Sequence, residues 1–191
     1  MYLCSFLALD VITVLFMYFM TYYLGTQGMT NLILGALILT QICSIPLAIY
    51  IAKKTSKTFS YMLGSALWAV FTLATLLITP SFSILFMFLL SILMGVSLAM
   101  TIVMIFSIFS AVCDVGELYF ERRSEGSFSG VQTFIRKACS AGAIGLVMLA
   151  LGVMGFKESQ VAGEIIEQSA NVILTIRLIL AIVPAILIII G

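Results

Sequence analysis

Six long apolar stretches, separated by short polar segments, make up most of the chain. Each stretch approaches or exceeds the about 20 residues that a helix needs to cross a bilayer. Backbone polar groups must be paired inside lipid, and barrel strands would need only about ten residues of alternating polarity, so the stretches predict helices. We therefore expect an all-α membrane protein with six transmembrane helices, near residues 2–24, 31–52, 61–79, 84–112, 130–155 and 170–191.

The composition agrees with this interpretation. Hydrophobic residues make up 63% of the 191 residues and charged residues only 9%, against roughly 25% charged residues in a soluble domain. A soluble fold of this length would leave apolar surface uncovered, so we expect the lipid bilayer to surround the chain. The formal net charge of +1 offers no basic surface, and we expect no nucleic-acid partner.

Reactive side chains are few. The sequence has no histidine, which excludes histidine-ligated haem and zinc sites and hydrolases that need a histidine base. The cysteines lie far apart and form no Cys-x-x-Cys pair, so we interpret them as small, reduced residues. They are Cys4, Cys43, Cys113 and Cys139. We expect no enzyme activity, no metal site and no resident cofactor.

Basic residues in the polar breaks predict the orientation of the chain. The first and third breaks contain none, and the fifth is mainly acidic. The second and fourth breaks contain Lys53, Lys54, Lys57, Arg122 and Arg123. Because Lys and Arg accumulate on the cytoplasmic side, we place the even-numbered breaks and both termini in the cytoplasm, and the chain in the cell (inner) membrane.

Four ionisable side chains fall at membrane depth: Asp10, Arg136, Lys137 and Arg177. A charge at the bilayer centre costs roughly 2.5–3.5 kcal/mol on insertion scales, so such residues face a bundle interior or a watery cavity. Asp10 lies near mid-bilayer, where it contacts either a polar solute or cation, or a basic residue of another helix. We expect Arg177 to extend outward or to pair with an acidic residue.

Arg136 and Lys137 are neighbours that point about 100° apart on a helix. Small residues flank Lys137 and permit close packing, which predicts that Lys137 faces the interior while Arg136 extends to the cytoplasmic interface. Gln132 and Thr133 lie about one turn before Lys137. Amide, hydroxyl and ammonium groups along one stripe suit a sugar or other polyhydroxy solute, although interhelical hydrogen bonding uses the same groups.

The segment from Cys113 to Lys137 reads CDVGELYFERRSEGSFSGVQTFIRK. It resembles the glycoside–pentoside–hexuronide:cation symporters, the melibiose-permease-like branch of the major facilitator superfamily. That family has Asp-x-x-Asp-Tyr-Gly-Glu, then Arg-x-Glu, then Gln-Thr and a Lys. The matching residues are Asp114, Gly116, Glu117, Arg123, Glu125, Gln132, Thr133 and Lys137.

The resemblance extends over nearly the whole chain, with some departures. Tyr22 to Gly25 resembles the end of the family's seventh helix, and Arg177 followed by Pro184 resembles its last helix. Three family positions differ here: an acidic residue, a tyrosine and an aromatic of the melibiose permease sugar pocket fall at Ala111, Val115 and Ile102. These departures reduce the acidic character of the loop and imply a different substrate.

The resemblance implies that residues 1–191 are the C-terminal six-helix bundle of a twelve-helix transporter, a 3+3 inverted repeat whose partner is the N-terminal six-helix half. It implies alternating-access symport of a sugar or glycoside with Na⁺ or H⁺, the cation site lying mainly in that partner half. The implied cavity residues are Asp10, Gln132, Thr133 and Lys137. The implied cytoplasmic gate comprises Asp114, Glu117, Arg123 and Glu125.

Two other interpretations stay open. The abrupt apolar ends fit a segment of a longer polypeptide and a complete small six-helix protein equally well; the latter would have a scaffolding, membrane-enzyme or other non-transport role. A non-functional remnant of a transporter gene is the third reading, since a half-bundle exposes its polar cavity wall to lipid.

Overall fold

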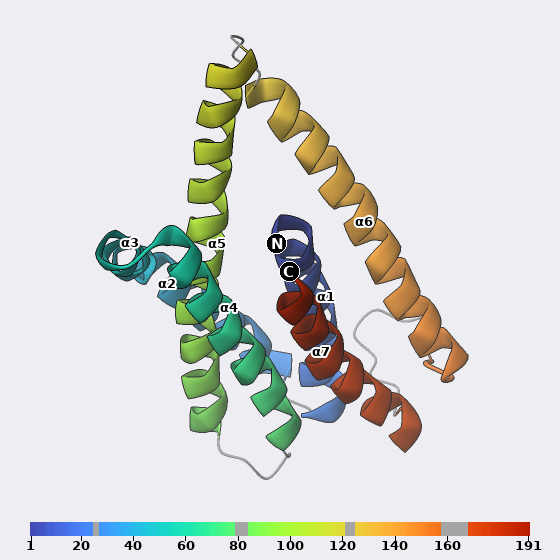
Figure 1. Ribbon diagram of the computed structural model, residues 1–191. Helices are drawn as coiled ribbons and strands as arrows, with labels where there is room; N and C mark the ends of the chain where they lie inside the picture. Colours follow the sequence, from blue (N-terminus) through green and yellow to red (C-terminus); the bar gives the residue numbers. More distant parts are fainter. Residues whose placement is uncertain (25–26, 79–83, 121–124, 158–167) are drawn as a thin grey trace.

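The computed structural model describes residues 1–24, 27–78, 84–120, 125–157 and 168–191, and nearly all of them are helical (Figure 1). No strand occurs within these ranges, and the predicted all-α fold class is confirmed. The helices are α1 (Tyr2–Tyr18), the π-helical turn η1 (Phe19–Tyr23), α2 (Gln27–Cys43), α3 (Ile45–Lys54), α4 (Lys57–Ala74), the 3₁₀ turn η2 (Thr75–Leu77), α5 (Ile84–Phe120), α6 (Glu125–Val153) and α7 (Ala170–Ile190).

The described helices supply up to six membrane spans by length and composition. Five are α1 with η1, α4 with η2, α5, α6 and α7. The sixth is the pair α2 and α3, bent by 40° at Ser44. Pro46 lies in the first turn of α3, where it cannot donate a backbone hydrogen bond to the preceding turn, so the helix restarts there. The second span, expected as one continuous helix, is therefore a broken one.

Helix packing relates two units of three spans each. The first unit is α1, α2–α3 and α4, and the second is α5, α6 and α7. Helix α1 packs against α6 and α7, and α5 packs equivalently against α2–α3 and α4, while α4 and α7 contact each other. Exchanging the two units leaves this pattern unchanged. Since each unit has three spans, the second enters the bilayer from the opposite side, as in an inverted repeat.

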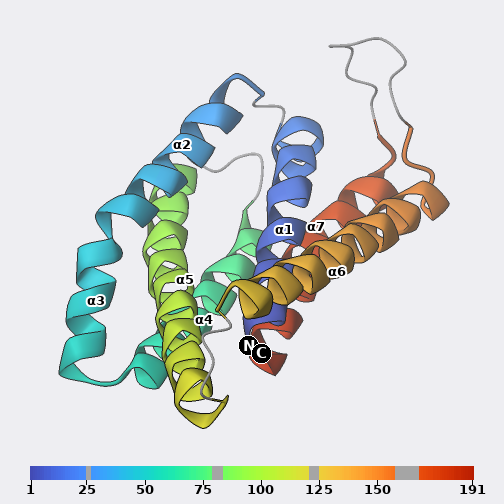
Figure 2. The same ribbon diagram turned by 90° about the horizontal axis from the view of Figure 1, so that it is seen from above.

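Both termini lie at one end of the bundle (Figure 2). The junction between α3 and α4 and the C-terminal end of α5 lie at the same end. The arrangement agrees with the relative placement expected for the termini and the even-numbered breaks. Their assignment to the cytoplasm stays a prediction. Figure 1 also shows that α5 and the first part of α6 extend beyond the ends of the other helices.

Two glycines inside helices allow close helix contacts. A Cβ atom on Gly64 of α4 would lie 2.7 Å from the Cβ of Met100 on α5. A Cβ atom on Gly95 of α5 would lie 2.7 Å from the carbonyl oxygen of Leu37 on α2. Membrane helices associate through such close van der Waals packing, because lipid supplies no hydrophobic drive between them. Helix α5 therefore holds α4 and α2 at short range.

We expect Gly95→Ala to destabilise the bundle by about 1–3 kcal/mol, because the new methyl group overlaps a backbone carbonyl that cannot move alone. Gly142→Ala is the matched control, since a Cβ there meets nothing within 4 Å. Because alanine has a higher helix propensity than glycine, this control should leave stability unchanged or raise it by up to about 1 kcal/mol. Thermal unfolding of the reconstituted variants measures both effects. Equal unfolding temperatures would contradict the close contact at Gly95.

Candidate functional site

An intramembrane polar cluster joins α1 to α6. The Arg136 guanidinium donates through Nη2 to Oδ1 of Asp10 at 3.3 Å. The hydroxyl of Ser140 donates to Oδ2 of the same carboxylate at 2.7 Å. Both carboxylate oxygens are thereby occupied. Because the side chains of Arg136 and Asp10 are only 30% and 23% exposed, each charge depends on the other for its compensation.

The cluster follows from helical spacing on both helices. Phe6 and Asp10 lie one turn apart on α1, and Arg136 and Ser140 lie one turn apart on α6, so two pairs face each other. The Phe6 ring lies under the guanidinium, with 4.0 Å from Arg136 Cζ to the ring centroid. A cation over an aromatic face gains about 0.5–2 kcal/mol, more when water is excluded. Arg136 is therefore held by a carboxylate and a ring at once.

Of the two roles left open for Asp10, the structure shows the contact with a basic residue of another helix. The partner is Arg136, which we had expected at the cytoplasmic interface, and not its neighbour Lys137. The turn of α6 that contains Arg136 and Ser140 faces α1, so Lys137 points about 100° away and is exposed. The rotation of a helix about its own axis decides which of two adjacent cations is paired.

The remaining expected cavity residues lie apart from this cluster. Thr133 and Lys137 are exposed, and Gln132 is half-buried. The small residues near Lys137 do not pack closely as expected, because Ala138, Ala141 and Gly142 are exposed. Within the described part of the chain this face of α6 is uncovered, and it presents the amide, hydroxyl and ammonium groups outward.

The expected cytoplasmic gate is only partly described. Asp114 and Glu117 are exposed on the last turns of α5, and Glu125 begins α6, where a carboxylate is favoured by the helix dipole. Arg123 lies outside the described residues. Lys57, the first residue of α4 at the same end of the bundle, donates through Nζ to the Ser107 carbonyl on α5 at 3.3 Å. No group of three acidic, cysteine or histidine side chains in the described ranges could hold a metal ion.

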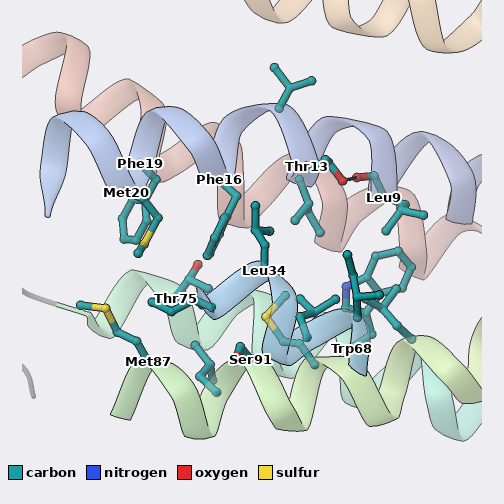
Figure 3. A pocket seen from close by; sticks show the side chains of 18 of the residues that line it. Leu9, Thr13, Phe16, Phe19, Met20, Leu34, Trp68, Thr75, Met87 and Ser91 are labelled. Atoms are coloured by element: carbon teal, nitrogen blue, oxygen red, sulfur yellow. Dashed lines mark hydrogen bonds between the residues drawn. The ribbon is translucent and has the colours of Figure 1, made fainter. Parts of the chain in front are cut away.

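A cavity of about 490 Å³ lies beside the polar cluster, between α1, α2, α4 and α5 (Figure 3). Its wall is mainly leucine, isoleucine, methionine and phenylalanine. Asp10 and Ser140 reach its edge. Its volume falls within the 300–1,000 Å³ typical of small-molecule pockets. The sequence offered no signal for it, since the same apolar residues would be needed to fill a solid core.

The Arg177 side chain donates hydrogen bonds to two backbone carbonyls. Its Nη2 donates to the Leu76 carbonyl at 2.7 Å and the Ile78 carbonyl at 3.4 Å, and its Cζ lies 4.5 Å from the Tyr23 ring centroid. The Tyr23 hydroxyl also donates to the Ile78 carbonyl, at 3.2 Å. A cation at a helix C-terminus satisfies carbonyls that have no partner within the helix. Neither of the expected roles of Arg177, outward extension or pairing with an acid, is the contact observed.

We expect Arg177→Gln to lower the free energy of unfolding by about 1.5–3 kcal/mol, the range for hydrogen bonds from a charged donor. Arg177→Lys keeps the charge but loses the forked geometry, so it should recover only part of the loss. Thermal unfolding in lipid nanodiscs gives the comparison. Wild-type unfolding temperatures in both variants would show that the capping contacts add nothing to stability.

A family model described as MFS/sugar transport protein matches residues 1–191. No curated protein matches the chain.

Proposed function

Because the chain belongs to the MFS/sugar transport protein family, we propose that it moves a sugar or glycoside across a membrane by alternating access. The match over residues 1–191 is the observation that carries this proposal. The helical membrane bundle and its two related three-span units are what such a mechanism uses, since rocking of repeats around a central site exposes it to each side in turn. The role is transport and not catalysis.

We further propose that the chain is the C-terminal half of the transporter, of the glycoside–pentoside–hexuronide:cation branch. Up to six spans in two related units are the size of one rocking bundle. The uncovered face of α6 supports this proposal, because Thr133 and Lys137 lie exposed on it at membrane depth. A lone ammonium facing lipid is costly. A second six-helix half would enclose these groups in a polar cavity.

In this proposal Lys137, Thr133 and Gln132 bind the hydroxyl groups of the sugar. Asp10 has a different role, because both of its oxygens are already bound by Arg136 and Ser140. It holds α6 in position beside the cavity. The coupling ion, Na⁺ or H⁺, binds mainly in the other half. Asp114, Glu117, Arg123 and Glu125 contribute to closing the cytoplasmic side.

Uptake into reconstituted vesicles tests the proposal. The chain is reconstituted alone and together with the polypeptide that supplies the other six helices, and a panel of radiolabelled sugars is offered under an imposed Na⁺ or H⁺ gradient. We expect accumulation only with both halves present. Robust gradient-driven uptake by the chain alone would contradict its role as a half. Absence of uptake for every sugar with both halves present would contradict sugar transport.

A further inference from the structure

The cavity beside α1 contains a buried hydrogen-bond donor that nothing in the described chain accepts. Trp68 lines the cavity and is only 1% exposed, so bulk water does not hydrate its indole. Its Nε1 atom has no hydrogen-bond partner among the described residues. Buried donors are almost always paired, and an unpaired one costs about 1–3 kcal/mol. A ligand that brings an acceptor atom would remove this cost.

The other hydroxyl groups of the wall do not compete for that acceptor. Thr13 and Ser91 each donate to a carbonyl of their own helix at 2.8 Å, and Thr75 of η2 donates to the Thr72 carbonyl of α4 at 2.6 Å. Ser140 donates to Asp10. Gln41 is the remaining polar side chain among the described lining residues. Asp10 is the one ionisable side chain among the described lining residues, and Arg136 already neutralises it. An anionic head would meet this carboxylate, and a cationic head would find no free counter-charge. The wall therefore favours a neutral ligand.

The shape of the cavity favours a linear apolar body. Its wall runs along α1 and η1 from Leu9 to Met20, about 16 Å at 1.5 Å per residue. In Figure 3, Trp68 and Leu9 lie at one end, and Met20 and Met87 lie at the other. Methionine side chains are flexible and adapt to irregular apolar partners. Apolar cavities bind apolar guests.

We propose that this cavity binds a neutral single-chain amphiphile, with an oxygen acceptor on the Trp68 indole N–H and the alkyl chain extending toward Met20 and Met87. The site is separate from the exposed Thr133–Lys137 face of α6 and does not depend on the proposed sugar transport. A medium-chain alcohol is the simplest molecule with this chemistry. An occupant would lie between α1 and α5, which are the first helices of the two related units.

Intrinsic fluorescence gives a direct test, because Trp68 is the single tryptophan of the chain. The protein is reconstituted in nanodiscs and titrated with 2-bromoundecan-1-ol, whose bromine lies beside the hydroxyl group and quenches indole fluorescence on contact. We expect saturable quenching that undecanol reverses. Bromoundecane, which has no oxygen, should bind roughly two- to tenfold more weakly at equal concentration in the bilayer, the value of one hydrogen bond. Quenching that neither saturates nor is reversed would overturn the site.

Two variants locate the binding. Ser91→Phe fills the cavity. It leaves no donor on another helix without a partner, because Ser91 Oγ donates to the Phe88 carbonyl of α5. It should weaken quenching at least tenfold. Leu89→Phe, on the exposed face of the same helix, should leave binding unchanged. Equal quenching in both variants would overturn the location. Equal affinity of the wild-type protein for the alcohol and the bromoalkane would overturn the assigned bond to Trp68. This comparison uses the wild-type protein alone, so it does not depend on the folding of a variant.

Discussion

Arg136→Gln and Asp10→Asn are each expected to lower the free energy of unfolding by about 2 kcal/mol, and the double variant by only about 1 kcal/mol. Each single change leaves one charge without compensation at membrane depth, which costs roughly 2.5–3.5 kcal/mol when the charge is fully in lipid. The partial exposure of both side chains reduces that figure. Removing both charges removes the need for pairing, and paired charges are often replaceable together.

The double variant is therefore expected to lose about 3 kcal/mol less than the sum of the two single variants. This coupling free energy is at the upper end for residues in direct contact. Unfolding by SDS titration in bicelles measures the free energy of unfolding of the wild-type protein, of both single variants and of the double variant. Lys137→Gln is the matched control, a cation next to Arg136 on α6 that points away from α1. Its effect should add to that of Asp10→Asn within about 0.5 kcal/mol. Additive effects of Arg136→Gln and Asp10→Asn would show that the contact has no energetic weight.

Lys137→Ala is expected to abolish gradient-driven sugar accumulation by the two-half transporter while membrane insertion and unfolding temperature stay at wild-type values. An ammonium that donates to a sugar hydroxyl contributes about 1.5–3 kcal/mol, so its loss weakens sugar binding by about ten- to hundredfold. Stability should not change, because Lys137 is exposed in this bundle. Radiolabelled sugar uptake, together with a binding titration, gives both quantities.

Lys157→Ala serves as the control for that experiment. Lys157 is also exposed, but it follows the C-terminal end of α6, outside the span. Its removal should leave uptake unchanged. Wild-type accumulation in the Lys137→Ala variant would remove Lys137 from the mechanism, and equal losses in both variants would point to a general effect of charge.

Most of the architecture could be predicted from the sequence, because lipid imposes a strong constraint on it. Long apolar runs must be helices there, and the polar breaks separate them. The break at Ser44 was missed although Pro46 marks it, because the apolar run continues across the bend. Length and hydropathy measure whether a segment can span, and they do not measure whether it stays straight.

The candidate site was less accessible to sequence reasoning. The sequence indicates that Asp10 needs a polar partner, but Arg136 and Lys137 are adjacent, and only the packing of α6 on α1 selects between them. Arg177 binds backbone carbonyls, which every residue possesses and no pattern reveals. The unpaired indole of Trp68 likewise depends on what surrounds it, and the surrounding residues are apolar whether the space is filled or empty.

Helix α5 is much longer than the hydrocarbon core is thick, so a tilt of this helix moves its far end over a large distance. Its 37 residues extend about 55 Å at 1.5 Å per residue, against a hydrocarbon core of about 30 Å. Gly95 lies at the crossing with α2 and can serve as the fulcrum. Glu117 is 22 residues beyond it, about 33 Å along the helix. A tilt of about 10° at the fulcrum would thus displace the Glu117 carboxylate by about 6 Å, roughly one helical turn. Small adjustments among buried side chains would be magnified into large excursions of the acidic residues at the membrane surface.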